Sequence, residues 1–494
     1  MATGGRVVKN RQLSSEIFQF LNRQPWRFET LLGQTKQTIG TCCNRQFSRT
    51  SRPQNRARRA SRSPSARCIL VTMLELDCGL EFFADFDADF FAALPARPGI
   101  FLLEMREVGA QPYLARTADI RRAAERLLSR PDTASKALNL REVVGRIRYR
   151  IAGSKFEQTF AYYENARAYF PRRYRDLVRL RPPAMLKVNL RNTYPRCYVT
   201  RRIRADEGFY FGPFASRRSA EDFSEGFLDL FKTRRCQIKI QRDPAYPGCM
   251  YSEMKMCLAP CFAGCTKEEY DVEVGRVLAT LESSGASLTE ELAREREAAS
   301  AALDFERAAA LHKRIDKVSA ALRGMPDIAR RIEELDVVIL QRAAEYQTIA
   351  VFPVRGGLLD EPLFLRFAEI SSEPRSVEAI LKQKLEPELA EDLPKPEAVT
   401  RAQREEEQPS VPPPASAADW RSQYGLRAAP PELPEHLSLI ARWFYSKPRD
   451  GEILFRDRVW PYRRMLRACS RLLAGPKQTP QEKLLEKKVP PHPA

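Results

Sequence analysis

Histidine is almost absent from this chain of 494 residues, which contains only His312, His436 and His492. Ser-His-Asp triads and histidine-rich zinc sites need such side chains in number, so both kinds of site are disfavoured. The sequence also has no run of eighteen apolar residues, the length that a membrane-spanning helix requires. We therefore expect a soluble protein with no membrane role, and its 43% hydrophobic content argues against a mainly disordered chain.

Acidic residues are scarce in two stretches, although the whole chain carries 82 basic and 63 acidic residues and a net charge of +19. Residues 1–72 hold 14 Lys/Arg and two acids, and residues 145–204 hold 16 Lys/Arg and three acids, with tyrosines interleaved in the second stretch. Basic residues beside aromatics suit phosphate neutralisation and base stacking, with a solvated basic face as the alternative. The candidate DNA-binding residues are Arg172, Arg173, Arg175, Arg179, Lys187 and Arg191.

Residues 1–72 show no packable periodicity, and three interpretations stay open. The segment is rich in Arg, Ser and Gln, as a transit peptide is. Met73 opens a cleaner stretch, so the upstream part also fits an over-extended reading frame. A basic arm that binds nucleic acid is the third interpretation.

The remaining chain divides by composition and periodicity into an α+β multidomain protein. Strand-like pieces at 99–105, 146–153, 156–163 and 196–203 alternate with a helical one at 118–129. Residues 335–367 predict three strands with a hairpin turn at Gly356 and Gly357, and a later helix and strand follow at 435–446 and 452–457. The expected parts are a small α/β domain at 73–204, a cysteine region at 205–270, a helical segment at 271–322, a β-rich domain at 323–384, a Pro/Glu-rich linker at 385–418, a further α/β part at 419–474 and a disordered tail at 475–494.

Four of the eleven cysteines, Cys236, Cys249, Cys257 and Cys261, follow the pattern C-x12-C-x7-C-x3-C. No secretory signal accompanies them, so disulfides are disfavoured. Zinc ribbons usually present C-x2-C pairs, which this sequence lacks, whereas iron–sulfur clusters tolerate irregular spacing. An iron–sulfur cluster, a zinc site and unliganded thiols all stay open, with Cys265 as a substitute ligand or a bystander.

Several motifs resemble those of the UvrC family, the C component of the ABC excinuclease in bacterial nucleotide excision repair. They are YFGPFAS at 210–216, then TRRC, CLAPC and ALDFERAAALHKRI at 302–315, in matching order from about Arg97 to Phe367. The resemblance implies that the four cysteines bind an iron–sulfur cluster, for which we expect the [4Fe–4S] type. It also implies a cytoplasmic bacterial protein that binds double-stranded DNA.

The stretch at 302–315 has helical periodicity after Asp304, a plausible N-cap, and predicts a hairpin with the helix before it. This hairpin resembles the UVR motif of the family, which implies that it is the docking element for UvrB, the B component of the ABC excinuclease. Periodicity alone favours an ordinary packed hairpin. The candidate partner-binding residues are Leu303, Phe305, Glu306, Ala309 and Ile315.

The domain at 73–204 resembles the GIY-YIG nuclease domain, in which a tyrosine, an arginine and a metal-binding glutamate cut phosphodiesters. Here GIF and YLA replace the signature triplets, so Tyr113 is kept while Phe101 lacks the hydroxyl and Ala115 replaces glycine. Arg121 matches the catalytic arginine, and Arg116 stands where a lysine is usual.

The family's metal-binding glutamate aligns with Tyr174 in this chain, and Asp176 and Glu164 are the nearest carboxylates. They are the substitute ligands for Mg²⁺ or Mn²⁺ if the nuclease is active. Residues 335–473 resemble the stretch that leads into the family's RNase H-like domain, and the chain ends before the metal-binding strand of that domain. We therefore expect a repair protein that binds DNA and docks on UvrB, with incision weak or lost. An active single-incision endonuclease and a structural or regulatory iron–sulfur protein are the alternatives.

Overall fold

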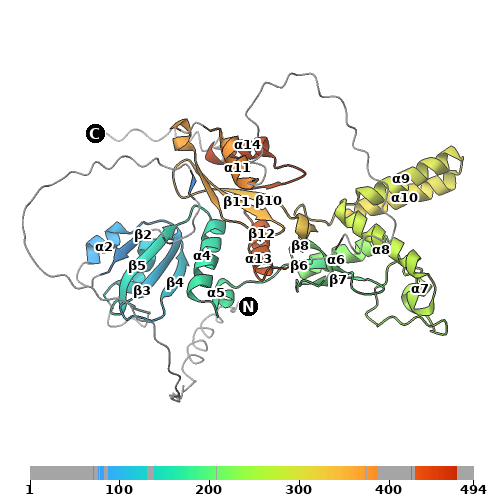
Figure 1. Ribbon diagram of the computed structural model, residues 1–494, viewed down its shortest axis with the longest axis horizontal. Coiled ribbons are helices and arrows are strands. Elements are labelled where there is room, and N and C mark those ends of the chain that lie inside the picture. The colour runs from blue at the N-terminus through green and yellow to red at the C-terminus, as the bar shows by residue number, and fades with distance from the viewer. Residues whose placement is uncertain are drawn as a thin grey trace, which may run out of the picture. The chain divides into compact units, whose positions relative to one another are not determined.

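The computed structural model describes residues 70–71, 76, 78–82, 87–130, 138–206, 208–372, 375–386, 424 and 429–474. All of them belong to one unit, residues 66–494. This part of the chain is a mixed α+β protein with three antiparallel sheets (Figure 1). Most of the predicted extension 1–72, the linker 385–418 and the tail 475–494 lie outside the described residues.

The N-terminal sheet has the strand order β2-β5-β3-β4 and is covered by helices on both faces. Helices α2 and α3 pack on one face, where alternate residues of β3 such as Phe101 and Leu103 point, and α4 packs on the other, against Ile100 and Leu102. This alternation is the two-residue period of a strand that is buried on both sides. The elements are β2 (Cys78–Glu81), α2 (Asp87–Ala93), β3 (Gly99–Met105), β4 (Tyr113–Thr117), α3 (Ile120–Leu128), β5 (Val144–Ile151), α4 (Lys155–Tyr169) and α5 (Tyr174–Val178).

The predicted strand at 156–163 is wrong, because these residues form the first half of α4. Ser154 caps this helix by accepting a hydrogen bond from the Glu157 N–H. Helix α4 lies between two sheets, so apolar residues surround it and the usual polar face of a helix is missing. The aromatic run therefore has no clear 3.6-residue period, and its composition is that of a strand.

The second sheet has the order β7-β6-β8-β9 and packs against α6 and α8. The cysteine region follows α6, and then α9 and α10 form an antiparallel hairpin. Asp304 caps α10 by accepting a hydrogen bond from the Arg307 N–H at 3.0 Å, which confirms the predicted helix start. The elements are β6 (Ala184–Asn189), β7 (Cys197–Thr200), β8 (Gly208–Phe214), α6 (Arg217–Leu228), α7 (Met250–Glu253), η1 (Pro260–Phe262), α8 (Lys267–Glu282), α9 (Ala286–Ala301), α10 (Phe305–Leu322), β9 (Arg330–Arg331) and η2 (Ile332–Glu334).

The third sheet has the order β1-β13-β11-β10-β14, with β12 paired to β11. Helices α11 and α14 cover one face, and α4 and α13 cover the other. The predicted hairpin turn is confirmed: Gly356 and Gly357 have φ angles of 53° and 79°, as a two-residue turn of type I′ requires. The elements are β1 (Leu70–Val71), β10 (Val337–Arg342), β11 (Thr348–Arg355), β12 (Leu358–Leu359), β13 (Leu363–Arg366), η3 (Phe367–Ser372), α11 (Val377–Leu385), α13 (Leu433–Phe444), β14 (Glu452–Phe455) and α14 (Tyr462–Ala474).

Two pairings cross the boundaries that we expected between parts of the chain. Strand β14 pairs with β10, so residues on both sides of the linker 385–418 build one sheet. Residues 70 and 71, inside the predicted extension, pair with β13. None of the helices in the described ranges combines the length and apolar character needed to span a bilayer.

Candidate functional site

The two strands that carry the altered signature triplets lie side by side in the N-terminal sheet. Their antiparallel register pairs Phe101 with Ala115 and Leu103 with Tyr113. Phe101 is buried, and its ring centroid lies 6.2 Å from that of the half-buried Tyr113. The two triplets therefore lie side by side, and they offer one phenol hydroxyl, that of Tyr113.

The side chain of Arg121 is bound to the backbone near the end of α2. Its Nε donates to the Leu94 carbonyl at 2.8 Å, and its Nη2 donates to the Ala92 carbonyl at 3.0 Å. These carbonyls are among the groups that a helix end leaves without partners. The guanidinium thus has a structural role, and a contact with a reacting phosphate has to compete with these two hydrogen bonds.

Arg116 is exposed at β4 and lies close to Tyr162 of α4. Its Nη1 donates to the Thr159 hydroxyl at 3.3 Å, and its guanidinium lies 5.7 Å from the ring centroid of Tyr162. Burial raises the pKa of Tyr162, with Arg116 acting to lower it and Tyr113 to raise it, so the three side chains are electrostatic neighbours. Arg116 therefore presents its positive charge on the α4 face of the sheet, opposite to the face that Phe101 and Tyr113 share.

The two substitute carboxylates stand on different helices. Glu164 lies in α4, where burial is the main cause that raises its pKa and Glu432 and Glu435 are further causes. Asp176 lies in α5 and is exposed. Within the described ranges, no three or more His, Cys, Asp or Glu side chains are placed to hold a metal ion. The arrangement therefore gives no support to a divalent-ion site in the conformation described.

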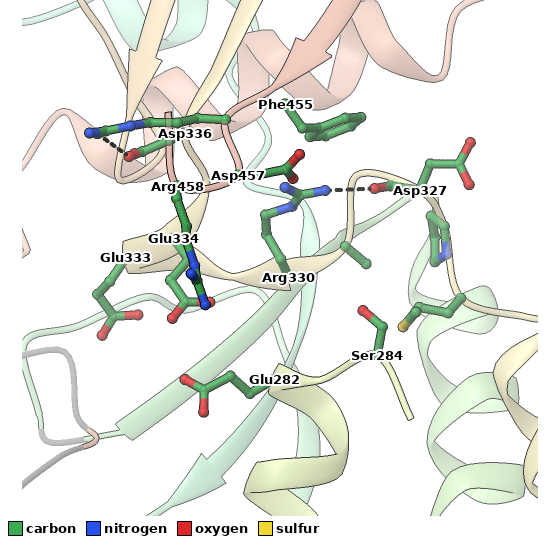
Figure 2. A pocket seen from close by; sticks show the side chains of 14 residues that line it. Glu282, Ser284, Asp327, Arg330, Glu333, Glu334, Asp336, Phe455, Asp457 and Arg458 are labelled. Atoms are coloured by element: carbon green, nitrogen blue, oxygen red, sulfur yellow. Dashed lines mark hydrogen bonds and ion pairs between the residues drawn. The ribbon is translucent and has the colours of Figure 1, made fainter. Parts of the chain in front are cut away.

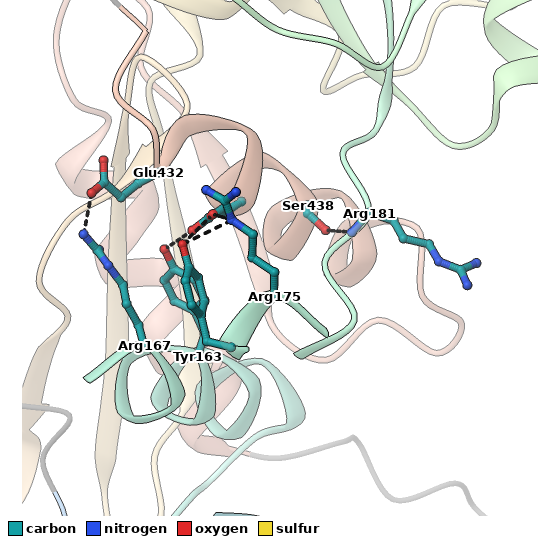
Figure 3. Close-up of polar contacts among 8 residues, drawn as sticks. Tyr163, Arg167, Arg175, Arg181, Glu432 and Ser438 are labelled. Atoms are coloured by element: carbon teal, nitrogen blue, oxygen red, sulfur yellow. Dashed lines mark hydrogen bonds and ion pairs between the residues drawn. The ribbon is translucent and has the colours of Figure 1, made fainter. Parts of the chain in front are cut away.

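Tyr174, at the position of the family's metal-binding glutamate, contacts a carboxylate from another part of the chain. Figure 3 shows this cluster, in which the Tyr174 hydroxyl donates to Glu435 Oε1 at 2.8 Å and Tyr163 donates to Glu435 Oε2 at 2.7 Å. Arg175 Nε adds a third hydrogen bond to the same carboxylate at 2.6 Å. Three donors satisfy Glu435, so this face of α4 and α5 is an anchoring surface for α13.

Sequence reasoning missed Glu435, which sits in the predicted helix at 435–446. The only sign of its role is that Glu435 and His436 interrupt an otherwise apolar face. Both side chains are buried, and an ionised group is rarely buried without partners. A polar pair inside an apolar helix predicts a buried contact, but its partners lie too far away in the sequence to be named.

The basic stretch 145–204 is exposed only in part. Arg172, Arg173, Arg179 and Arg191 are exposed, and Arg175 is bound to Glu435 as described above. Lys187 is 4% exposed and forms an ion pair with Asp206 beside the Tyr210 ring. Its burial argues against a direct phosphate contact. Three of the interleaved tyrosines, Tyr162, Tyr163 and Tyr194, are buried core residues and cannot stack on bases.

The four spaced cysteines are neighbours in the structure. Burial, followed by the charges of Cys236, Cys249 and Cys261, raises the pKa of Cys257 to about 11. Burial is also the main cause that raises the pKa of Cys261, with Cys249 and Cys236 as further causes. All four are free thiols. Among the described residues, no group of three or more His, Cys, Asp or Glu side chains is placed to hold a metal ion, and this includes the four cysteines. The fold thus gathers the four sulfurs in one region without closing them around a common point.

Two of the four cysteine sulfurs accept hydrogen bonds from neighbouring groups. The Ala259 N–H donates to Cys257 Sγ at 3.3 Å, and Arg234 Nη1 donates to Cys236 Sγ at 3.8 Å. Hydrogen bonds to sulfur are among the contacts by which proteins tune iron–sulfur clusters. Cys265 is buried and is influenced by Cys261, so it stays a neighbour of the four.

The α9–α10 hairpin exposes apolar side chains at its turn. Leu303 is 72% exposed and Phe305 is 66% exposed, while Glu306 and Ala309 are also on the surface. Ile315 is partly buried against the core of the second sheet. Four of the five predicted partner-binding residues are therefore accessible, and the tip presents a small apolar surface without a partner among the described residues.

A cavity of about 770 Å³ lies near the end of α8 and the loop after β14. Figure 2 shows carboxylates and guanidinium groups around the same space. Arg330 lies 4.0 Å over the Phe455 ring and donates to the Asp327 carbonyl at 3.1 Å. Burial, followed by the Glu282 charge, raises the pKa of Glu334. The mixed charges of this cavity offset one another, and we assign no ligand to it.

Comparison with known proteins assigns a class to one part of this arrangement. Residues 184–280 match the sequence model of a domain described as the UvrC/Cho excinuclease middle domain. The match covers the second sheet from β6 to β8, the cysteine region and most of α8.

The chain is similar to the protein named UvrABC system protein C in several bacteria. It is 28% identical to that of Dehalococcoides mccartyi over 272 residues, which are 54% of this chain and 44% of the relative. It is 26% identical to that of Moorella thermoacetica over 297 residues, 59% of this chain and 48% of the relative. The chain is thus a distant homologue that spans about half the length of these curated relatives. No solved structure matches it.

Proposed function

We propose that this chain is a DNA-binding protein of nucleotide excision repair, related to UvrC, that docks on UvrB and has weak or lost incision activity. The similarity to UvrABC system protein C, which includes the middle domain at 184–280, carries the proposal. The state of the GIY-YIG-like face supports the loss of incision, because Phe101 lacks a hydroxyl and Arg121 is bound to backbone carbonyls.

A nicking assay tests the loss of incision. The full chain, purified without oxygen, is incubated with lesion-containing duplex DNA, UvrB and Mg²⁺ or Mn²⁺. We expect binding without nicking, because the described residues contain no group of three or more His, Cys, Asp or Glu side chains that could hold the metal. Metal-dependent nicking that disappears in Arg121→Ala would instead establish an active single-incision endonuclease and contradict the proposal.

The exposed tip of the α9–α10 hairpin is the proposed contact with UvrB. Leu303 and Phe305 expose apolar surface that gains stability when a partner covers it. Phe305→Ala should weaken binding to UvrB in a titration followed by calorimetry. Tyr346→Ala is the matched control, since Tyr346 is 83% exposed but lies outside the hairpin. Equal binding by Phe305→Ala and the control would contradict this docking role.

We propose that Cys236, Cys249, Cys257 and Cys261 hold an iron–sulfur cluster of the [4Fe–4S] type. Such a cluster would cross-link the loops on both sides of α7 through sulfur ligands. Iron and sulfide analysis of protein purified without oxygen should give about four of each per chain. Cys257→Ser should lose most of this content, and Cys265→Ser should keep it. About one zinc per chain without sulfide would favour the zinc alternative.

A further inference from the structure

Three arginine side chains from separate parts of the chain gather beside the N-terminal sheet. Arg116 lies in β4, Arg181 follows α5, and Arg442 lies in α13, and all three are exposed. Burial, followed by the charges of Arg116 and Arg181, lowers the pKa of Arg442, and no carboxylate of the described residues opposes this shift. Hydrogen bonds place two of them together, because Arg442 donates to carbonyls at the end of α5 and the Arg181 N–H donates to Ser438, one turn before Arg442 in α13.

Neutral groups hold Arg442 in this position. Its Nη1 donates to the Val178 carbonyl at 3.2 Å, and its Nη2 donates to the Arg179 carbonyl. Both carbonyls stand at the end of α5, where a helix leaves its last carbonyls unpaired. Because a guanidinium has five N–H donors, other donors of Arg442 stay available.

The other two arginines, Arg116 and Arg181, also make hydrogen bonds to neutral groups, which do not compensate their positive charges. The backbone N–H of Arg181 donates to the Ser438 hydroxyl at 2.9 Å, while its side chain extends away from Ser438 (Figure 3). The Arg116 side chain donates to the Thr159 hydroxyl, which is neutral. The fold thus fixes the backbone of one arginine and the side chains of two.

Two other arginines that face α13, Arg167 of α4 and Arg175 of α5, behave differently. Arg167 forms an ion pair with Glu432, and Arg175 forms one with Glu435. Within the ranges that the structure describes, none of the three gathered arginines has an ion-pair partner of this kind. Positive charges held together without a counterion cost free energy, and an anion that binds among them relieves this cost.

We propose that Arg116, Arg181 and Arg442 form a binding site for a phosphate group of the DNA backbone. This inference rests on the proposed function, because DNA supplies the phosphate. Guanidinium groups match phosphate oxygens with paired N–H donors, which suits a site built from arginines rather than lysines. Arg116 contacts Thr159 of α4, so the site holds the DNA backbone on the face of the N-terminal sheet opposite to Phe101 and Tyr113 and retains it there without cutting.

The test compares the full chain with Arg181→Gln and Arg442→Gln in duplex-DNA binding followed by fluorescence anisotropy. Each variant should weaken binding about tenfold, as expected when one charge-assisted hydrogen bond is removed. The slope of log affinity against log salt concentration should fall by about one for each phosphate that is no longer neutralised. Arg467→Gln, at an exposed position of α14, is the matched control and should change neither quantity.

Arg442→Gln also removes hydrogen bonds to the end of α5, so thermal unfolding is measured for every variant. Arg181→Gln removes no side-chain contact of the fold that is described above and keeps the test valid if Arg442→Gln unfolds. Binding by Arg181→Gln with the affinity and salt slope of the unchanged chain contradicts the phosphate site while leaving DNA binding intact.

Failure of the unchanged chain to bind duplex DNA would contradict the proposed function instead. The anion site is then judged with inorganic pyrophosphate as the probe. A rise in melting temperature with pyrophosphate that is absent in the Arg181→Gln, Arg442→Gln double variant supports the site. An equal rise in the double variant contradicts it.

Discussion

The Tyr163 hydroxyl donates a hydrogen bond of 2.7 Å to Glu435, although 272 residues separate the two in the sequence. Both side chains are buried between the N-terminal and third sheets. The bond fixes α13 against α4 and helps to place Arg442, about two turns further along α13, at the end of α5 near Arg181. A contact that looks purely structural thereby helps to assemble the proposed phosphate site.

Tyr163→Phe removes this hydrogen bond while it keeps the ring packing. Glu435 then loses one of three donors inside the core, and a hydrogen bond to a charged group contributes about 1.5–3 kcal/mol. We expect the free energy of unfolding, measured with urea, to fall by about that amount. Tyr346→Phe changes an exposed tyrosine and should leave it unchanged, and an equal effect of the two variants would contradict the role of the bond.

The buried His436 should make the free energy of unfolding fall as the solution is acidified. Burial lowers the pKa of His436 to about 4, and its Nδ1 accepts a hydrogen bond from the Leu359 N–H, which requires the neutral ring. The folded state disfavours the protonated form, so the stabilisation is present above pH 6.5, the unfolded value, and is lost as the pH falls towards 4. The full effect is about 3 kcal/mol.

Urea unfolding of the unchanged chain and of His436→Gln, measured between about pH 7 and pH 4, separates this contribution from other titrating groups. The difference in unfolding free energy between the two proteins should shrink as the pH falls. A difference that stays constant across the range would show that the imidazole does not titrate as described.

Local signals in the sequence predicted much of the fold. The strand at 99–105, the helix around 120–128, the Gly356–Gly357 turn and the Asp304 cap are set by neighbours in the sequence. Each depends on a short pattern of apolar alternation, capping or positive φ. Elements of this kind need no knowledge of the rest of the chain.

The parts that sequence reasoning missed depend on distant contacts. Helix α4 lacks a polar face because sheets cover it on two sides, and β14 reaches β10 across the linker. The roles of Glu435 and Lys187 follow from partners that only the folded chain brings near. The GIY-YIG resemblance located Tyr113 and Arg121, but it gave no sign that Arg121 is bound to the end of α2.

Gly99, the first residue of the GIF triplet, lies where the N-terminal sheet has no room for a larger side chain. A Cβ atom at this position would lie 2.1 Å from the Arg150 carbonyl oxygen and 2.8 Å from Ile120 Cδ1. Gly99→Ala forces the strands apart, and we expect it to lower the free energy of unfolding by about 1–3 kcal/mol or more.

Gly226→Ala is the matched control for that change. Gly226 lies in α6, and no atom outside its own surroundings would meet a Cβ atom there within 4 Å. Alanine favours a helix over glycine, so this variant should gain about 0.5–1 kcal/mol. Opposite signs in urea unfolding support the close approach at Gly99, and a neutral Gly99→Ala would contradict it.

The basic stretch 145–204 predicts two different outcomes for changes that each remove positive charge. Arg172 and Arg173 are exposed, so the double change to glutamine should lower the salt slope of duplex binding by about two. Lys187 is buried and paired with Asp206, so Lys187→Met should lower the free energy of unfolding by about 3 kcal/mol. Its salt slope should match that of the unchanged chain.

Anisotropy titrations at several salt concentrations and urea unfolding, made on the same preparations, distinguish these outcomes. Charge alone would predict similar losses of DNA affinity from either change, because each removes lysine or arginine from the same stretch. The structure predicts that exposure decides which charge reaches a phosphate. A lower salt slope for Lys187→Met in folded protein would mean that Lys187 leaves Asp206 to contact DNA, and would contradict the buried pair as its bound state.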